Sequence, residues 1–451
     1  MILTVDFGST FTKLTAIDEE SQKIAGSARA FTTIETDIRD GFNKALSELE
    51  SIVGKIEYKE KYAASSAGGG LKMVAVGLVT ELTAKAARLA ANNAGAKVIK
   101  TYSYELSDEE CDEIHAIAPD IILLCGGTNG GNKDVIIQNA KSIAKIDGNF
   151  SVVVAGNKSA SRAVMDALKN RNAILTANVM PSFGQLDIEP AKGAIRELFI
   201  SRIIEAKGIS AAQKMMSYDI IPTPLAAFQA AQLLSDELKG LMVIDIGGAT
   251  TDVYSMADGA PKKPNAVLRG IIEPFAKRSV EGDLGLRYSM PTLIEAATAS
   301  QIAKEASVSE EDIAEWLMRC SKDKGILPNS PTEKNIDDTL AALAVEIGTV
   351  RHCGRVEAVF TPVGETFLQE GKDLSDIKYI IGAGGPAIGS KDPAALLSRA
   401  FASEKNPFSL MPQKAKLLLD ESYIFSAMGL LKQTRPELAL NIMKSQIKEV
   451  G

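Results

Sequence analysis

The sequence predicts a duplicated α/β fold. Two segments, one in each half of the chain, read alike: Ile2–Lys13 (ILTVDFGSTFTK) and Leu241–Asp252 (LMVIDIGGATTD). Each is an apolar run that ends in aspartate, continues through a turn of small residues and enters a second alternating run, which is typical of a β-hairpin. Farther along each half, an apolar strand leads into a Gly-Gly turn, at Ile121–Gly131 (IILLCGGTNGG) and Tyr379–Gly389 (YIIGAGGPAIG). This repeated order of elements predicts two related α/β domains.

The segments between these motifs have the spacing of helices. Apolar residues recur at i, i+3 and i+4 in Thr80–Asn93 and in Leu340–Arg351, which predicts amphipathic helices there. Two prolines precede an alanine-rich helix that is expected over Leu225–Leu234. Gly325–Asp337 (GILPNSPTEKNID) combines glycine, proline and asparagine, and we expect it to be the main loop of the second half.

Composition excludes several classes of protein. With 45% hydrophobic and 24% charged residues, the 451-residue chain is expected to be globular, neither disordered nor collagen-like. Its net charge of −7 argues against a broad surface for nucleic acids or anionic membranes. No uninterrupted apolar run has the length of a membrane span, and the sequence enters a strand directly after Met1. These features predict a cytoplasmic protein.

Cysteine and histidine are too sparse to indicate a metal centre built from these residues. The four cysteines form no CxxC pair and are expected to be reduced cytosolic thiols. The two histidines, His115 and His352, stand far apart in the chain. We expect His352 to be a helix cap or a packing residue.

The two hairpins have the chemistry of a phosphate cradle. Glycine lets backbone N–H groups converge on phosphate oxygens, because it has no Cβ and tolerates positive φ. The strand-end aspartates, Asp6 and Asp245, are then placed to hold a hydrated Mg²⁺ and to position the attacking water. The turn residues expected to bind nucleotide are Gly8, Ser9, Thr10, Gly247, Gly248, Thr250 and Thr251.

Two further hairpin residues leave alternatives open. Lys13 stands where the second hairpin has Asp252. Lys13 is expected either to meet a phosphate or to face solvent. Asp252 is a candidate catalytic carboxylate that orients water, or else a partner of its own turn.

Three other motif interpretations fail on their context. Asp6-Phe7-Gly8 spells the metal-binding triplet of protein kinases, but no catalytic loop precedes it. Gly382-x-Gly384-x-x-Ala387 fits a loose dinucleotide-binding fingerprint, which belongs in a first βαβ unit and not near the end of the chain. Gly126–Lys133 approaches a Walker A sequence but lacks Gly-Lys-Ser/Thr.

The motifs together resemble the superfamily of actin, sugar kinases and heat-shock chaperone ATPases. Asp6–Thr12 is similar to its first phosphate motif, Asp245–Asp252 to its second, and Ile380–Gly385 to its adenosine motif. Ile221–Ala231 is similar to its first connecting helix. The resemblance implies actin-like (ribonuclease H-like) ATPase domains with a nucleotide cleft between them, and ATP or ADP with Mg²⁺ as ligands.

Further candidate residues follow from this resemblance. Gly382, Gly384 and Gly385 are expected to let the adenosine approach the backbone. Glu281 and Asp283 resemble part of the chaperone segment that follows the second phosphate hairpin. They are expected either to serve the nucleotide cleft or to supply charge at a helix N-terminus.

Five more motifs narrow the resemblance to the glutamate mutase accessory protein family, also called GlmL or MutL and unrelated to the mismatch-repair MutL. They run over essentially the whole chain and are Ser65–Val79, Leu123–Asn132, Val280–Leu286, Arg351–Gly354 and Ser426–Leu430. Membership implies a slow Mg²⁺-dependent ATPase that reactivates an adenosylcobalamin-dependent mutase by releasing damaged cobalamin. Glutamate mutase (methylaspartate mutase) or a related aminomutase would be the client. The subunits of this mutase are the expected partners. The resemblance leaves open whether the chain also forms a homodimer.

The expected domain limits combine the repeat with the resemblance. The first ATPase domain is expected over residues 1–235 and the second over residues 236–420. A C-terminal helical segment over residues 421–451 is expected to pack back on the first domain.

Three alternatives share this fold. A small-molecule kinase related to acetate or sugar kinases would need a catalytic base beyond the hairpin carboxylates, and the sequence offers no obvious one. An activase of radical dehydratases would bridge an iron–sulfur cluster, but neither Cys320 nor Cys353 lies in a glycine-bounded loop. The third is an actin-like protein that forms filaments.

Overall fold

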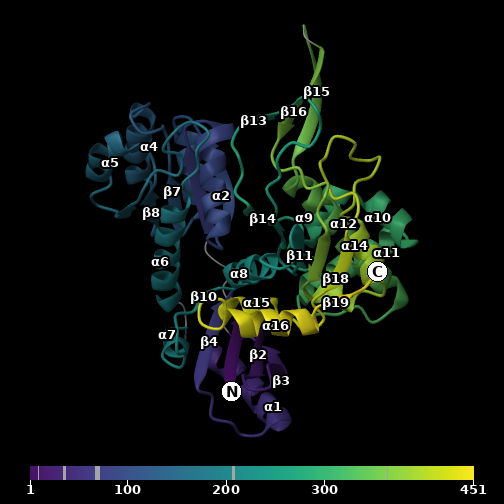
Figure 1. Ribbon diagram of the computed structural model, residues 1–451. Coiled ribbons are helices and arrows are strands. Elements are labelled where there is room, and N and C mark those ends of the chain that lie inside the picture. Colours follow the sequence, from purple (N-terminus) through teal and green to yellow (C-terminus); the bar gives the residue numbers. More distant parts are fainter. Residues whose placement is uncertain (9, 34–36, 67–71, 206–208, 363) are drawn as a thin grey trace. The chain divides into compact units, whose positions relative to one another are not determined.

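The computed structural model describes the chain except for residues 9, 34–36, 67–71, 206–208 and 363 (Figure 1). The chain divides into two compact units. Unit 1 comprises Met1–Gln229, Gly270–Pro274 and Ser426–Leu438. Unit 2 comprises Ala230–Arg269, Phe275–Phe425 and Ala439–Gly451. Each unit is a mixture of helices and sheets, as the sequence predicts.

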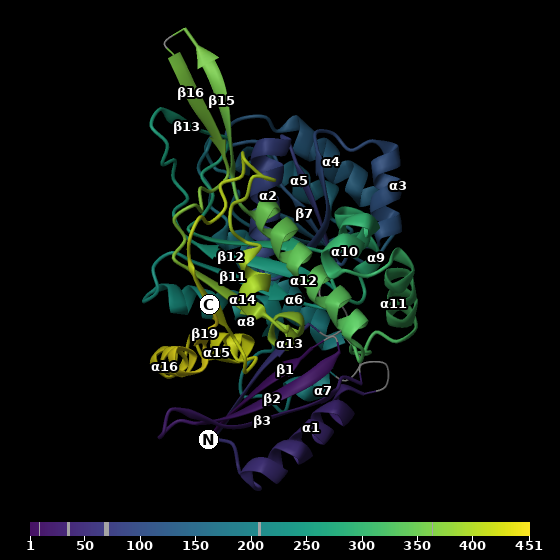
Figure 2. The same ribbon diagram turned by 90° about the vertical axis from the view of Figure 1, so that its right-hand side faces the viewer.

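The first sheet of unit 1 has the strand order β10-β4-β1-β2-β3. β1, β2 and β3 pair antiparallel in chain order, while β4 runs parallel to β1, and β10 parallel to β4. Helix α1 (Ile38–Val53) packs on this sheet with its buried residues, among them Phe42 and Leu49 (Figure 2). The strands are β1 (Ile2–Phe7), β2 (Phe11–Asp18), β3 (Lys23–Phe31), β4 (Glu60–Ser65) and β10 (Ile221–Pro222).

The main sheet of unit 2 repeats this arrangement, in the order β14-β12-β11-β17-β18-β19. β11, β12 and β14 pair antiparallel in chain order, β17 runs parallel to β11, and β18 runs parallel to β17. Five strands therefore correspond in order and direction between the units, which confirms the duplicated, ribonuclease H-like fold. The strands are β11 (Leu241–Ile246), β12 (Thr251–Met256), β14 (Ala276–Glu281), β17 (Tyr379–Ala383), β18 (Lys416–Leu419) and β19 (Lys448–Glu449).

The predicted match between the two strand-Gly-Gly segments is wrong. Tyr379–Gly389 contains β17, which lies beside β11, but the counterpart of β17 in unit 1 is β4 and not Ile121–Gly131. The glycines that follow β4 fall within residues 67–71, outside the described residues. Ile121–Gly131 instead contains a strand of a separate sheet. Any buried strand that leads into a helix can read as a short apolar run followed by a glycine turn. This pattern therefore does not tell which of the two sheets of a unit the strand joins.

The second sheet of unit 1 is entirely parallel, in the order β6-β5-β7-β8-β9. Alternate residues of its strands belong to two different cores. Leu123 and Val153 pack with α2 and α6, while Leu124 and Val154 pack with α3, α4 and α5. Helices therefore cover both faces of this sheet, as parallel sheets require. Its strands are β5 (Lys72–Gly77), β6 (Lys97–Ser103), β7 (Ile121–Leu124), β8 (Ser151–Val154) and β9 (Asn172–Leu175).

The remaining helices of unit 1 bear out one of the helix predictions. Thr80–Asn93 is helical throughout, with a π-helix η1 (Thr80–Ala84) that continues into α2 (Lys85–Asn93). The others are α3 (Asp108–Ile117), α4 (Asp134–Lys145), the 3₁₀-helix η2 (Lys158–Ala160), α5 (Ser161–Ala167), α6 (Glu189–Glu205) and α7 (Ile209–Gln213). Helix α8 (Thr223–Ser235) includes the predicted alanine-rich helix and supplies residues to both units.

In unit 2 the helix prediction for Leu340–Arg351 is confirmed, and the loop prediction for Gly325–Asp337 is partly wrong. Both segments extend into α12 (Pro331–His352), whose first turns take up Pro331–Asp337. Ser330 caps this helix by accepting from the Glu333 N–H, and Pro331 occupies the first helical position, where proline is favoured. The proline that suggested a loop therefore begins a helix.

The other elements of unit 2 surround its core, in which Trp316 is buried. Among the described residues we find no helix with the length and apolarity that a membrane span needs. The helices are α9 (Met290–Ala297), α10 (Ala299–Ala306), α11 (Glu310–Lys322), α13 (Gly385–Gly389) and α14 (Pro393–Ser398), with α15 (Phe425–Leu430) and α16 (Pro436–Gln446) shared with unit 1. A small sheet consists of β13 (Ala266–Arg269), β15 (Arg355–Thr361) and β16 (Gly364–Glu370).

Candidate functional site

The first hairpin places Asp6 at the end of β1, directly opposite Lys13 of β2. Its turn is tightly held. The Gly8 N–H donates to the carbonyl oxygens of Asp6 and Phe11, both at 3.0 Å, and the Gly8 carbonyl accepts from Thr32 Oγ1 at 2.8 Å. A Cβ at Gly8 would lie 2.6 Å from the Phe11 carbonyl oxygen, so only glycine fits. Thr10 is described, but Ser9 lies outside the described residues.

Two hydroxyl groups hold the Asp6 carboxylate. Asp6 Oδ1 accepts from Thr223 Oγ1 at 2.6 Å, and Oδ2 accepts from Ser426 Oγ at 3.3 Å. Thr223 begins α8 and Ser426 lies in α15, and both belong to unit 1. Sequence reasoning missed both residues as site residues, although each lies in a segment that carries the family resemblance. These contacts orient Asp6 and leave lone pairs on its oxygens for another ligand.

Replacing Thr223 with valine is expected to weaken Mg²⁺–nucleotide binding about fivefold, because a net hydrogen bond contributes about 1 kcal/mol. Valine keeps the shape of threonine and removes only the hydroxyl that orients Asp6. Titration of the purified variant with MgADP measures the effect. Ser426→Ala is the matched comparison, since its longer contact should matter less. Equal, unchanged affinities in both variants would contradict the orienting role.

The second hairpin places Asp245 opposite Asp252. The carbonyl groups of its turn are occupied: Gly247 O accepts from the Leu286 N–H, and Gly248 O accepts from the N–H groups of Arg287 and Tyr288. Within the described part of the chain, the N–H groups of Gly248, Ala249 and Thr250 have no hydrogen-bond acceptor, and these three residues are partly exposed. A turn whose carbonyls are bonded and whose N–H groups remain available is suited to an anion.

Asp252 is buried in an ion pair that the sequence did not reveal. Its Oδ1 accepts from Arg278 Nε at 2.9 Å and Nη2 at 2.6 Å, and its Oδ2 accepts from Thr250 Oγ1 at 3.0 Å. Arg278, on β14, is 2% exposed, and its guanidinium lies 6.0 Å from the Tyr254 ring centroid. Burial raises the pKa of the Tyr254 hydroxyl well above its ordinary value. Asp252 is thus a partner of its own turn and of β14, and its catalytic role stays a prediction.

The two candidate carboxylates that follow this hairpin, Glu281 and Asp283, share one arginine of α12. Arg351 Nη1 donates to Glu281 Oε2 at 2.9 Å and to Asp283 Oδ1 at 2.7 Å, and Nη2 donates to Asp283 Oδ2 at 2.9 Å. Arg351 opens the Arg351–Gly354 motif of the family resemblance. The structure therefore shows these carboxylates binding the end of β14 and the residues after it to α12, and a contact with nucleotide stays a prediction.

The candidate adenosine-binding glycines lie at the end of β17, next to the second hairpin. Gly382 is within β17, where a Cβ would lie 2.9 Å from the Leu397 side chain. Gly384 has a φ of 89°, and a Cβ there would lie 2.1 Å from the Ile246 carbonyl oxygen and 2.7 Å from Asp245 Oδ1. Gly385 begins α13. Pairing of β11 with β17 thus brings Asp245 and Gly384 together, although they are far apart in the sequence.

A magnesium ion fits the donors that the hairpins offer. We find no group of three or more His, Cys, Asp or Glu side chains that could enclose a metal ion among the described residues. Mg²⁺ needs no such cage, because it usually keeps several waters and binds one or two carboxylates together with substrate phosphates. Asp6 and Asp245 are carboxylates of this kind, each beside a glycine turn.

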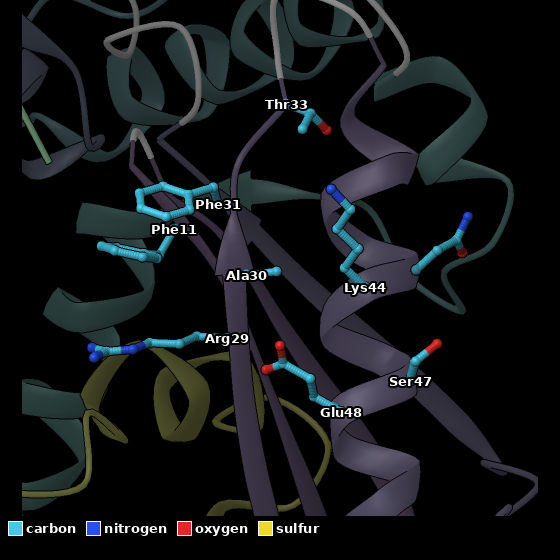
Figure 3. Close-up of a pocket in the computed structure, with 9 residues that line it drawn as sticks. Phe11, Arg29, Ala30, Phe31, Thr33, Lys44, Ser47 and Glu48 are labelled. Carbon is cyan, nitrogen blue, oxygen red and sulfur yellow. The ribbon is translucent and has the colours of Figure 1, made fainter.

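An open pocket of about 600 Å³ lies on unit 1 beyond the first hairpin (Figure 3). Phe11 and Phe31 stack there with ring centroids 4.6 Å apart, and the Arg29 guanidinium lies 5.1 Å from the Phe11 ring. Lys44 and Glu48 of α1 line the opposite side. Of the predicted site residues that the structure describes, none lines this pocket.

His352, the last residue of α12, is a buried packing residue. Its ring nitrogens share hydrogen bonds with Ser279 Oγ at 2.7 Å and Ser255 Oγ at 2.8 Å. Burial lowers the pKa of His352 well below its ordinary value, and the charges of Lys277 and Lys372 lower it further. The folded protein therefore keeps this imidazole neutral.

The free energy of unfolding should fall as the pH drops below about 6.5, by up to about 1.4 kcal/mol per pH unit from this residue. The unfolded chain binds a proton at His352 at its ordinary pKa, whereas the folded chain binds one only at lower pH. Urea unfolding between about pH 7.5 and about pH 5.5 measures the slope. His352→Gln should flatten this slope relative to the parent. Identical slopes in the variant and the parent would contradict this account.

Comparison with known proteins identifies relatives over the whole chain. The model of the MutL protein family matches residues 2–447. "Protein MutL" of Clostridium tetanomorphum is 44% identical over 458 residues, which cover 99% of each chain.

Solved structures of low sequence identity also align with the chain. A glycerol dehydratase reactivase is 10% identical with a TM-score of 0.36, covering 96% of this chain and 99% of its own. The activator of the 2-hydroxyisocaproyl-CoA dehydratase from Clostridium difficile, solved with bound ADPNP, is 11% identical with a TM-score of 0.32, covering 100% of this chain and 99% of its own. Nucleotide-free acetone carboxylase is 12% identical with a TM-score of 0.43, and the match covers 95% of this chain and 70% of the carboxylase chain.

Proposed function

Because the chain belongs to the MutL protein family, we propose that it is an ATP-binding accessory protein that reactivates an adenosylcobalamin-dependent mutase. The observation that supports nucleotide binding most directly is the second hairpin. Among the described residues, the N–H groups of its turn have no acceptor, and Gly384 lies close beside the Asp245 carboxylate. The first hairpin repeats the strand-end aspartate and the glycine turn.

In this proposal each residue has a limited task. The turn N–H groups bind phosphate oxygens. The carboxylates of Asp6 and Asp245 would hold hydrated Mg²⁺, which would neutralise phosphate charge. Asp245 also orients a water that attacks the γ-phosphorus. The bond from that phosphorus to the bridging oxygen of ADP breaks, and the products are ADP and inorganic phosphate. Placement and charge neutralisation contribute most of the catalysis in such reactions.

Reactivation requires that nucleotide and client influence each other's binding. A coupling free energy of about 1–3 kcal/mol is typical of such linked sites. We propose that the ATP-bound and ADP-bound forms differ in affinity for a mutase that holds damaged cobalamin, so that hydrolysis releases the cofactor and then the client. Glutamate mutase or a related aminomutase is the proposed client.

Nucleotide binding is tested first, without any client. Saturation of a site that exists only in the folded state, at about 100 times the dissociation constant, should add about 2.7 kcal/mol to the free energy of unfolding. Thermal melts with MgATP, with ATP plus EDTA, and without nucleotide measure this effect. A melting temperature indifferent to MgATP would refute nucleotide binding.

Reactivation is tested with a mutase inactivated by damaged cobalamin. Activity should return only when this protein, ATP, Mg²⁺ and fresh adenosylcobalamin are all present, and a non-hydrolysable ATP analogue should support no repeated cycles. Full recovery without nucleotide would refute the mechanism. Phosphorylation of a free metabolite in the absence of client would instead support the kinase alternative.

A further inference from the structure

The parallel sheet of unit 1 contains a point where its connections diverge. β5 and β7 are neighbours, and the chain leaves β5 toward α2 on one face and leaves β7 toward α4 on the other (Figure 1). In open α/β sheets of this strand order, ligands bind outside the carboxyl ends of the two strands at that point. Here the corresponding loops are Leu78–Val79 after β5 and Cys125–Lys133 after β7. The second loop contains Gly126–Lys133, the segment that approaches a Walker A sequence. Nucleotide binding at the two hairpins does not involve this segment.

The loop after β7 turns its carbonyl groups inward. Gly127 O accepts from Asn178 Nδ2 at 2.9 Å, and the carbonyls of Gly131 and Asn132 accept from Asn157 Nδ2, both at 3.0 Å. Both asparagine side chains are buried. In addition, Gly126 O accepts from the Asn157 N–H. These contacts fix the loop and occupy its acceptors.

The donors of the same loop remain available. Within the described part of the chain, the N–H groups of Gly126, Gly127 and Thr128 have no hydrogen-bond acceptor, and neither has that of Gly156, which follows β8. Gly126, Gly127 and Gly156 are buried. Unpartnered N–H groups on buried residues are rare in native proteins, so such donors after two neighbouring strands favour a ligand that completes them.

Glycine is required for this arrangement. Gly127 has a φ of 69°, and a Cβ there would lie 2.0 Å from the Asn132 carbonyl oxygen. Two exposed lysines belong to this region of the chain: Lys133 is the N-cap residue of α4, and the main-chain N–H of Lys158 donates to Asn129 Oδ1 at 3.0 Å. Asp134, in the first turn of α4, is the acidic residue of this segment.

We propose that the loop Cys125–Lys133 binds the phosphate group of a phosphate ester, at a site separate from the two hairpins. N–H donors with bonded carbonyls, two nearby lysines and the N-terminus of a twelve-residue helix all favour an anion. The segment lacks the Lys-Ser/Thr pair of a Walker A loop, so the site binds its ligand without hydrolysing it. Two sources share this chemistry: the phosphates of a free nucleotide and the phosphodiester in the nucleotide tail of a cobalamin. The phosphate site itself is inferred independently of the proposed function, and only the choice of cobalamin as a source rests on that function.

The sequence allows a selective measurement at this loop. Cysteine precedes glycine only at Cys125–Gly126 and Cys353–Gly354. Labelling the full chain with [¹³C-carbonyl]cysteine and [¹⁵N]glycine therefore isolates two amide signals in a carbonyl-filtered spectrum. Gly126 reports on the proposed site, while the Gly354 N–H is bonded to the Lys372 carbonyl in unit 2 and serves as an internal control.

The Gly126 signal should shift and saturate with at least one of FMN, Mg²⁺-free ATP and hydroxocobalamin, while the Gly354 signal stays in place. A response to FMN or ATP assigns a free nucleotide, and a response to hydroxocobalamin alone assigns the phosphodiester. No response to any probe, or a response to inorganic phosphate only, would overturn the proposal.

Matched variants separate this site from the hairpins. Lys158→Ala should weaken the Gly126 response about tenfold, as expected for the loss of a charge-assisted contact. Lys141→Ala, an exposed lysine on the same helix α4, should not change it. Asp245→Ala should also leave it intact. A response lost with Asp245→Ala, or equally weakened by both lysine variants, would place the ligand elsewhere and overturn the assignment.

Discussion

Replacing Arg278 with alanine is expected to lower the free energy of unfolding of unit 2 by about 3–5 kcal/mol. Arg278 is 2% exposed, and it donates twice to Asp252, whose side chain is itself only 10% exposed. The variant would leave a carboxylate buried without its cation. Removing one partner of a buried pair costs more than the pair itself contributes, because the remaining charge stays desolvated.

Urea unfolding followed by circular dichroism measures this loss. The matched control is Arg355→Ala, because Arg355 pairs with Glu370 at the surface and its side chain is 73% exposed. Exposed pairs contribute about 0–1 kcal/mol, so the control should change little. The double variant Arg278→Met with Asp252→Leu should recover much of the loss. Equal small effects of Arg278→Ala and Arg355→Ala would show that the buried pair does not stabilise the sheet.

Replacing Asp245 with alanine is expected to lower the rate of ATP hydrolysis by about a hundredfold to a thousandfold, the range found when a group that stabilises a transition state is removed. Asp245 lies at the end of β11, partly exposed, beside the turn whose N–H groups have no acceptor among the residues that the structure describes. Its loss removes a carboxylate for the metal and for the attacking water, and leaves the apolar residues of β11 buried as before.

Steady-state phosphate release with saturating MgATP measures this effect. Asp258→Ala removes an exposed aspartate of unit 2 that follows β12, at the end of the hairpin opposite to its turn, and should keep the parental rate. A melting temperature within about 2 °C of the parent confirms that Asp245→Ala is folded. Hydrolysis by a folded Asp245→Ala at the parental rate would show that the carboxylate has no catalytic part.

Local patterns in the sequence were sufficient to predict the elements that repeat. The β-hairpins at Asp6 and Asp245 follow from alternating apolar residues around a small-residue turn, because strand pairing across a short turn involves only neighbouring residues. The same holds for the helix at Thr80–Asn93. Pro331 shows the limit of local reading, since proline is compatible with a loop and with the first turn of a helix.

Only the tertiary structure decided which distant residues meet. β4, and not β7, pairs with β1. The segment Ile121–Gly131, which contains β7, therefore belongs to the parallel sheet, and its glycines form a loop there. Likewise, Thr223 reaches Asp6 and Arg278 reaches Asp252. Which of these residues meet depends on the order of strands that are distant in the sequence. It also depends on which charged groups the fold removes from water. Sequence periodicity contains neither, because it reports only which face of an element is apolar.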